Sequence, residues 1–445
     1  MSTPETPTPA AGTDANTGTT GTNDANGTAD PTAVDPTVVP ADLQDERLIA
    51  SQGIGGWASA TWGRLRSGDL GSLPVVVGLV LIWGVFYALE PAFLSSRNLV
   101  NLSLQMVAVG TIAIGVVLVL LLGEIDLSIG SMAGLSAAIL AVMFVVKETS
   151  VILAVLAALG AGAIVGLLYG TLFNRFGVPS FVITLAGLLA LLGLQLRVLG
   201  NQGTINLPFE SSLVRFASQQ FLPVWVAYAL ALIAPAIYAL SALRRNARRA
   251  EAGLSTVPFP RLALRAAGLT AVLVIVVAVL NRDRGVSYMF LTFLLLVVVM
   301  DLAIRRTRWG RSVLAIGGNV EAARRAGINV RRIYLSVFTL CSTFAALGGI
   351  FAASRLASAN QSSGGGDTNL NAIAAAVIGG TSLFGGRGSA YSALLGILVI
   401  QSISNGLDLL AVESNVKFMV TGAVLLLAVI IDSLSRRSRA AHGRA

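Results

Sequence analysis

Long apolar runs alternate with short polar segments between residues 73 and 433. Most of these runs approach the roughly 20 residues that a helix needs to cross the hydrocarbon core of a bilayer. The pattern predicts an all-α polytopic membrane protein with about 11–12 transmembrane helices. The run at 370–381 is short for a crossing, so we interpret it as a short or re-entrant segment. The predicted spans are 73–90, 99–122, 129–146, 151–173, 180–199, 222–243, 264–280, 286–304, 333–353, 370–381, 389–411 and 416–433.

The two ends of the chain differ from this apolar domain. Residues 1–48 are rich in Thr, Ala, Gly, Asp and Pro and contain few large apolar side chains, so we expect a disordered cytoplasmic extension. Residues 49–72 carry two tryptophans and two arginines, which favours an interfacial segment ahead of the first span. The transmembrane domain then covers 73–433, and 434–445 form a basic cytoplasmic tail.

Arginines are concentrated in the loop that follows residue 243, in the segment 305–332 and in the tail. An excess of arginine in short loops marks the cytoplasmic side of a membrane protein. The loops that the same topology places outside are nearly neutral. With 370–381 counted as a crossing, both termini are expected in the cytoplasm.

Composition narrows the possible chemistry. The chain is 55% hydrophobic and only 12% charged, which is typical of a membrane protein. Its net charge of +9 comes from arginines in the short loops, which indicate the orientation of the chain in the membrane and not nucleic-acid binding. A single cysteine and a single histidine are too few for a disulfide or a zinc cluster, and the distance between Cys341 in an apolar run and His442 in the basic tail argues against a Cys/His dyad. Neither of the two lysines lies in a P-loop motif. We therefore expect no catalytic residue, metal site or cofactor in this chain.

The segment 305–332 carries eight arginines and one acid, Glu321. Its Gly-Gly-Asn sequence, 317–319, predicts a flexible polar turn, and Asn319 is suited to cap a short helix that starts near Val320. Helix-forming residues follow, and Gly327 is suited to the C′ position that ends the helix. Two interpretations fit: a basic loop that only obeys the positive-inside rule, or an exposed helix that docks on a cytoplasmic partner.

Two carboxylates, Glu124 and Asp126, lie in the sequence GEIDLS between two apolar runs. Acidic residues at membrane depth often mark a transport pathway, whereas at the headgroups they cost little. Their spacing places them on different faces of a helix, so they are not expected to share a proton. We interpret Asp126 and Ser128 as caps at a helix break more than as ligands of a substrate.

Five glycines occur within residues 379–389, IGGTSLFGGRGS from Ile378 onward, and they predict a tight cytoplasmic turn that includes Gly380, Thr381 and Ser382. A path for a neutral polyol should instead offer hydroxyl and amide groups. Hydroxyl and amide groups at or near span ends are candidates for such contacts or for hydrogen bonds between helices. They are Asn101, Gln105, Thr111, Asn174, Thr184, Gln195, Asn360, Gln361, Asn369, Asn371, Gln401 and Asn405.

Three motifs, GEIDLSIGS at 123–131, AIGGNVEAARRAGINVRR at 315–332 and IGGTSLFGGRGS at 378–389, resemble those of bacterial ATP-binding-cassette (ABC) permeases of the ribose/xylose type. The resemblance covers roughly residues 73–432, and Glu124 replaces the commoner glycine. It implies a plasma-membrane protein, a cytoplasmic ATPase that binds ATP and Mg, an external sugar-binding protein and a second permease copy. It also implies that the short helix couples to the ATPase. The coupling residues would be Gly317, Gly318, Asn319, Glu321, Ala322, Ala323, Arg324 and Gly327.

The resemblance therefore predicts import of a monosaccharide, with xylose or a related pentose first. The alternative is a secondary carrier or channel that works without ATP. Such proteins more often carry paired acids and bases within their spans, and the predicted spans here hold few acids. A P-loop ATPase and a secreted sugar-binding protein encoded beside this chain would distinguish the two.

Overall fold

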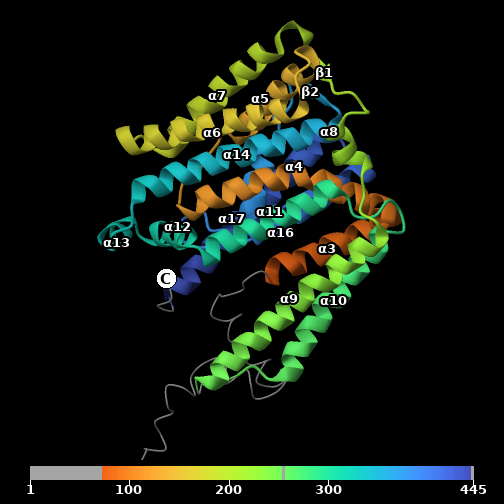
Figure 1. Cartoon of the computed structure of the whole chain (residues 1–445), viewed down its shortest axis with the longest axis vertical. Coiled ribbons are helices and arrows are strands. Elements are labelled where there is room, and N and C mark those ends of the chain that lie inside the picture. Colours follow the sequence, from red (N-terminus) through yellow and green to blue (C-terminus); the bar gives the residue numbers. More distant parts are fainter. Residues whose placement is uncertain (1–72, 253–255, 442–445) are drawn as a thin grey trace, which may run out of the picture.

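The computed structural model describes residues 73–252 and 256–441, so the predicted segments 1–48 and 49–72 and the last four residues of the tail lie outside it. The described chain is almost entirely helical (Figure 1). Its elements are α3 (Leu73–Leu89), η2 (Pro91–Leu94), α4 (Ser96–Leu121), α5 (Ile129–Ala141), η3 (Val142–Val146), α6 (Val151–Phe176), α7 (Ser180–Leu199), η4 (Gly200–Gln202), β1 (Thr204–Asn206), α8 (Ser212–Val214), η5 (Arg215–Gln219), α9 (Val224–Glu251), α10 (Phe259–Leu280), α11 (Tyr288–Arg306), α12 (Arg308–Gly318), α13 (Val320–Arg325), α14 (Val330–Leu356), β2 (Ser358–Asn360), α15 (Thr368–Ile378), α16 (Ala390–Leu409) and α17 (Ser414–Ala441).

A helix occupies each of the twelve predicted spans. Nine helices within the described residues are long and apolar enough to cross a membrane, while α3 and α15 are shorter apolar helices. The 11 residues of α15 give a length of about 17 Å, well below the hydrocarbon thickness. The expected fold class is thus confirmed, including the short element. Helix α17 continues to Ala441, through most of the predicted tail.

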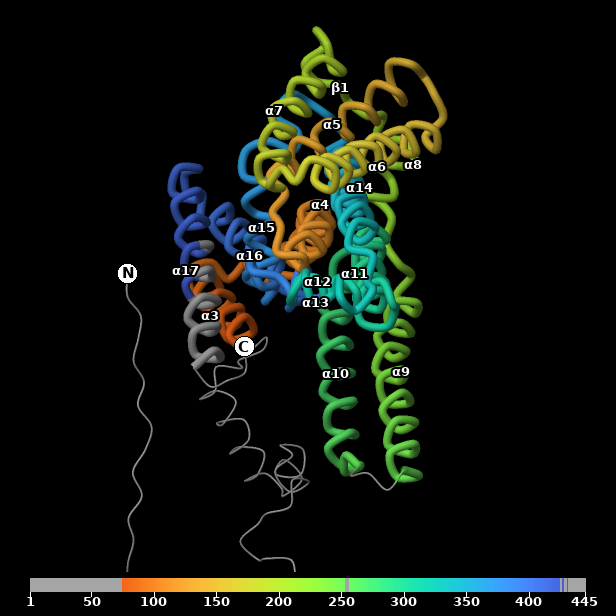
Figure 2. The backbone as a smooth tube through the Cα atoms, turned by 90° about the vertical axis from the view of Figure 1, so that its left-hand side faces the viewer, coloured from red at the N-terminus to blue at the C-terminus, as the bar shows by residue number. Residues whose placement is uncertain are grey.

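Helix α4 is the centre of the molecule and is almost entirely buried. It packs against α14, α16, α15 and α11, and α14 packs in turn against α6 and α5 (Figure 1). Helices α9 and α10 form an antiparallel pair that extends away from this body (Figure 2). Their side chains include many exposed apolar residues, such as Ile237 and Ile275. An apolar surface of this kind is suited to lipid.

Close helix contacts depend on small residues. A Cβ added at Gly162 of α6 would lie 2.7 Å from the Ser342 carbonyl oxygen of α14, and one at Gly396 of α16 would overlap the Ala375 carbonyl of α15. Such glycines let helix backbones touch, which is how helices associate when lipid is as apolar as their side chains.

Helix α14 connects two ends of the molecule. It starts just after α13, at the end that we call the arginine face and that holds α12 and α13. It finishes just before β2, which pairs antiparallel with β1 at the opposite end of the molecule (Figure 1). We call this end the strand face. The sequence pattern did not predict this two-stranded pairing, because each strand has only three residues.

Candidate functional site

The arginine face is built on α12, a helix that the sequence pattern did not predict. Thr307 caps it by accepting a hydrogen bond from Gly310 N at 3.1 Å, and the side chains of Val313 and Ile316 are buried. Trp309 Nε1 donates to Ser336 Oγ of α14 at 2.8 Å, which fixes α12 against that helix. The helix has a buried apolar face and an exposed basic face, as expected for a segment at a membrane surface.

The predicted flexible turn at 317–319 is wrong for its two glycines. Gly317 and Gly318 are the last residues of α12, and only Asn319 is outside a helix. Gly317 is required there for packing, because a Cβ at this position would overlap the Leu121 carbonyl oxygen at the end of α4. Tertiary contact therefore holds this pair in a helix that its low helix propensity disfavours.

Helix α13 confirms the predicted short helix. Asn319 Oδ1 accepts from Ala322 N at 2.9 Å, which satisfies a free N–H at the helix start. At the other end Gly327 has φ +78°, its N–H donates to Arg324 O at 3.0 Å, and Ile328 N donates to Ala323 O at 3.1 Å. This pair of bonds is a Schellman motif, which ends a helix sharply.

One face of α13 is free for a partner. Ala323 is buried against the body, whereas Glu321, Ala322 and Arg324 are exposed. The ion pair between Glu321 and Arg324, 2.7 Å long, is solvent-exposed and contributes little to stability. These side chains are therefore available for contacts outside this chain.

Three glycine-containing segments meet at the C-terminal end of α12. Gly386 N donates to Leu121 O at 2.9 Å, at the point where α4 ends and the turn containing Gly123 begins. A Cβ added at Gly385 would lie 2.7 Å from Gly317 O and 3.0 Å from Gly123 N. We call this contact of 121–123, 317–318 and 385–386 the glycine junction. The sequence identified all three motifs but gave no sign that they touch.

The turn between α15 and α16 supplies the third part of the junction. Gly380, with φ +102°, leads out of α15, and the buried Thr381 follows it. Ser382 N donates to Arg387 O at 3.0 Å, and Ser382 Oγ accepts from Phe384 N at 3.2 Å. These bonds close a compact turn, as the glycine pattern predicts.

Asp126 starts α5. Its Oδ1 accepts hydrogen bonds from Ser128 N at 2.8 Å and from Ser128 Oγ at 2.7 Å, and its side chain is buried. On the other side Cys341 Sγ of α14 lies 3.8 Å from Oδ2. The predicted cap is wrong in detail: Ser128 is the N-cap residue of α5 but its side chain makes no capping hydrogen bond, and Asp126 instead orders the turn that leads into α5 by accepting from Ser128.

Glu124, two residues earlier, lies nearer the arginine face. Ser180 Oγ at the start of α7 donates to Glu124 Oε2 at 2.6 Å. Burial raises the pKa of Glu124, while hydrogen bonds from Ser180 and Tyr334 act in the opposite direction. Glu124 and Asp126 therefore have separate partners and do not form a pair.

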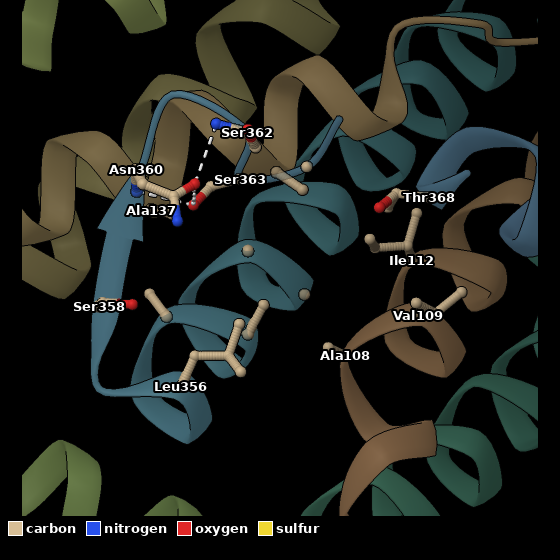
Figure 3. A pocket seen from close by; sticks show the side chains of 16 residues that line it. Ala108, Val109, Ile112, Ala137, Leu356, Ser358, Asn360, Ser362, Ser363 and Thr368 are labelled. Carbon is tan, nitrogen blue, oxygen red and sulfur yellow. Dashed lines mark hydrogen bonds between the residues drawn. The ribbon is translucent and has the colours of Figure 1, made fainter. Parts of the chain in front are cut away.

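A cavity of about 280 Å³ opens near the strand face, between α4, α5, α14 and the segment that follows β2 (Figure 3). One part of its wall consists of small apolar residues, among them Ala108, Ala133 and Gly349. Ser358 and Asn360 lie on one side of it, and Thr368 lies on the other beside Ile112 (Figure 3). Of these polar residues the sequence analysis identified only Asn360.

Comparison with known proteins identifies the family. The model of the family described as branched-chain amino acid transport system / permease component matches residues 98–429. The chain belongs to this permease family. It is 35% identical to the xylose transport system permease protein XylH of Escherichia coli over 84% of this chain and 94% of that protein. It is 32% identical to XylH of Haemophilus influenzae, over 84% and 99%, and 31% identical to the ribose import permease protein RbsC of Escherichia coli, over 80% and 92%. No solved structure matches.

The permease is a component of a binding-protein-dependent transporter and is not its catalytic subunit. The resemblance found in the three motifs is thereby confirmed.

Asn405, a predicted pathway residue, is part of α16 of the permease and faces α4. Its amide exchanges two hydrogen bonds with Asn98, of 2.7 and 3.1 Å, and also donates to Gln105 at 3.3 Å. This arrangement joins two helices, which is the alternative role for such amides.

The sequence analysis did not single out Asp301, an acidic residue inside the predicted span 286–304. Asp301 of α11 is buried, and its carboxylate accepts from Arg305 Nε at 3.0 Å, one helical turn later. The i,i+4 spacing of this pair was readable from the sequence. The pair is close to the arginine face, so Asp301 is neutralised locally.

The two hydrogen bonds that Asp126 accepts from Ser128 lead to a prediction for two variants. Asp126→Ala removes the acceptor of two hydrogen bonds at a buried site, so we expect it to lower the free energy of unfolding by about 1–3 kcal/mol. Asp126→Asn retains an acceptor oxygen and should keep both thermal stability and transport close to wild type. Melting of the purified permease and uptake in cells test this. Loss of uptake by a stable Asp126→Asn protein would show that the carboxylate has a transport role.

Proposed function

We propose that this permease imports a monosaccharide, xylose or a related pentose, within an ABC transporter. The named relatives support the sugar class, since they are xylose and ribose permeases that the chain matches over most of its length. In this proposal the arginine face is cytoplasmic, by the positive-inside rule, and the strand face meets an external sugar-binding protein. Two copies of the permease would form the path, with two ATPase subunits that bind ATP and Mg.

The observation that carries the coupling role is that the exposed α13 directly follows α12, whose end lies in the glycine junction. A partner that moves α13 would move α12, and α12 contacts the end of α4 and the turn between α15 and α16. Helix α4 extends from this junction, and α14 from the end of α13, to the cavity wall. Closure of an ATPase dimer would thus be transmitted as a rigid-body movement of the helices that surround the cavity.

The test is ATP hydrolysis by membranes that contain the permease together with the ATPase encoded beside it. The external binding protein is added empty, or loaded with xylose, ribose or glucose. We expect stimulation by the binding protein, strongest with its preferred sugar, which would define the substrate. An intact complex that no loaded sugar stimulates, together with sugar uptake that needs no ATP, would favour the secondary carrier instead.

A further inference from the structure

We infer that the cavity near the strand face is a transient site for a neutral monosaccharide, held by free hydroxyl and amide groups of residues 358–368. This inference rests on the proposed function and assigns it a location. The cavity lies between the helices that the glycine junction would move, so its shape depends on the same movement.

The lining matches an uncharged polyol. Among the described residues that line the cavity none is charged, and most are Ala, Gly, Val, Ile or Leu. An amino acid, which the family description names, would bring an ammonium and a carboxylate group, and burying these without charged partners is costly. A sugar can place its C–H face on Ala133 and Gly349 and direct its hydroxyls to polar side chains.

Polar groups for such contacts remain unused. Within the described chain, the hydroxyls of Ser358, Ser362 and Thr368 form no hydrogen bond to protein, and neither does the amide nitrogen of the Asn360 side chain. Asn360 Oδ1, by contrast, accepts from Ser362 N at 2.9 Å and from Ser363 Oγ at 3.3 Å. The oxygen shapes the turn and the nitrogen is left for a ligand. Figure 3 shows Thr368 across the cavity from Ser358 and Asn360, so a molecule between them can be held from two sides.

The segment that carries these groups is fixed in place. Strand β2 pairs with β1, with Asn360 opposite Thr204. Gln195 of α7 is buried, and its Nε2 donates to Asn360 O at 3.1 Å and to Ser363 O at 3.0 Å. Gly364 then packs against the backbone of Gly130 and Gly134 in α5, where a Cβ would overlap. The polar groups are therefore held in position before a ligand arrives, which lowers the entropic cost of binding.

The experiment uses the full transporter in proteoliposomes, with xylose-loaded binding protein and ATP. The double variant Ser362→Ala with Thr368→Val removes two free hydroxyls and breaks no bond within the protein. We expect it to reduce the xylose transported per ATP hydrolysed by about ten-fold, as for the loss of two hydrogen bonds of ordinary strength. Stimulation of ATP hydrolysis by the binding protein should stay near wild type, because the two changes are small and do not touch the glycine junction or α13.

A second variant and a control separate this effect from misfolding. Ala352→Phe fills the cavity from a half-exposed position on α14 and should reduce xylose transport even further in an assembled complex. Ser354→Ala, on the same helix, removes a hydroxyl that donates to Ile350 O at 2.7 Å and does not line the cavity, so it should transport as wild type. Wild-type transport per ATP by both cavity variants would overturn the inference alone. Failure of the wild-type transporter to move any monosaccharide would overturn the proposed function as well.

Discussion

Replacing Gly317 by alanine is expected to abolish coupled uptake. The added methyl group would overlap the Leu121 carbonyl oxygen and lie 2.5 Å from Gly386 N, both of them backbone atoms that cannot turn aside as a flexible side chain can. Overpacking of this kind costs about 1–3 kcal/mol, which corresponds to a loss of about 5- to 150-fold in the population that keeps α12 seated on the glycine junction. Since α13 follows α12 directly, the coupling helix would be displaced with it.

Gly318→Ala is the matched control. Gly318 is the next residue of the same helix, and a Cβ there meets nothing within 4 Å. Alanine is also the better helix former, so this variant should couple as well as wild type. The measurement is uptake together with stimulation of ATP hydrolysis, at equal amounts of permease in the membrane. Equal activity of the two variants would mean that the junction does not transmit the movement.

The contrast between these neighbours shows what the sequence could not reveal. Local rules correctly predicted α13, its Asn319 cap and its end at Gly327, because capping depends on a few adjacent residues. The same rules assigned Gly317 to a turn, because glycine is a poor helix former. The contact that keeps it helical comes from Leu121, almost 200 residues away in the chain.

The cavity was beyond sequence reasoning for a related reason. Long apolar runs located a helix at each of the twelve predicted spans, since burial in a bilayer requires such runs. They could not show where helices separate, because the residues that line the cavity, such as Ala137, Ala352 and Ser362, are of the same kind as those in tight helix contacts. Only the positions of α4, α5 and α14 relative to the segment after β2 distinguish the two.

The remaining large effect is expected at Gly327, where proline should abolish coupled uptake while the protein still inserts in the membrane. Proline fixes φ near −65°, whereas Gly327 has φ +78°, and it removes the N–H that bonds to Arg324 O. The Schellman end of α13 would be lost, and with it the direction in which the exposed face of the helix is presented. No Cβ contact lies within 4 Å of this glycine, so the effect would come from the backbone alone.

Gly327→Asn is the informative companion, because asparagine tolerates the left-handed conformation and keeps its N–H. We expect it to retain most of the uptake, within a few-fold of wild type, while Gly327→Pro loses uptake and the stimulation of ATP hydrolysis together. Both are measured in membranes where binding of the ATPase is followed by co-purification. Normal uptake by the proline variant would show that α13 is only a basic loop segment; equal loss in both variants would mean that glycine itself, through close approach of the partner, is required at this position.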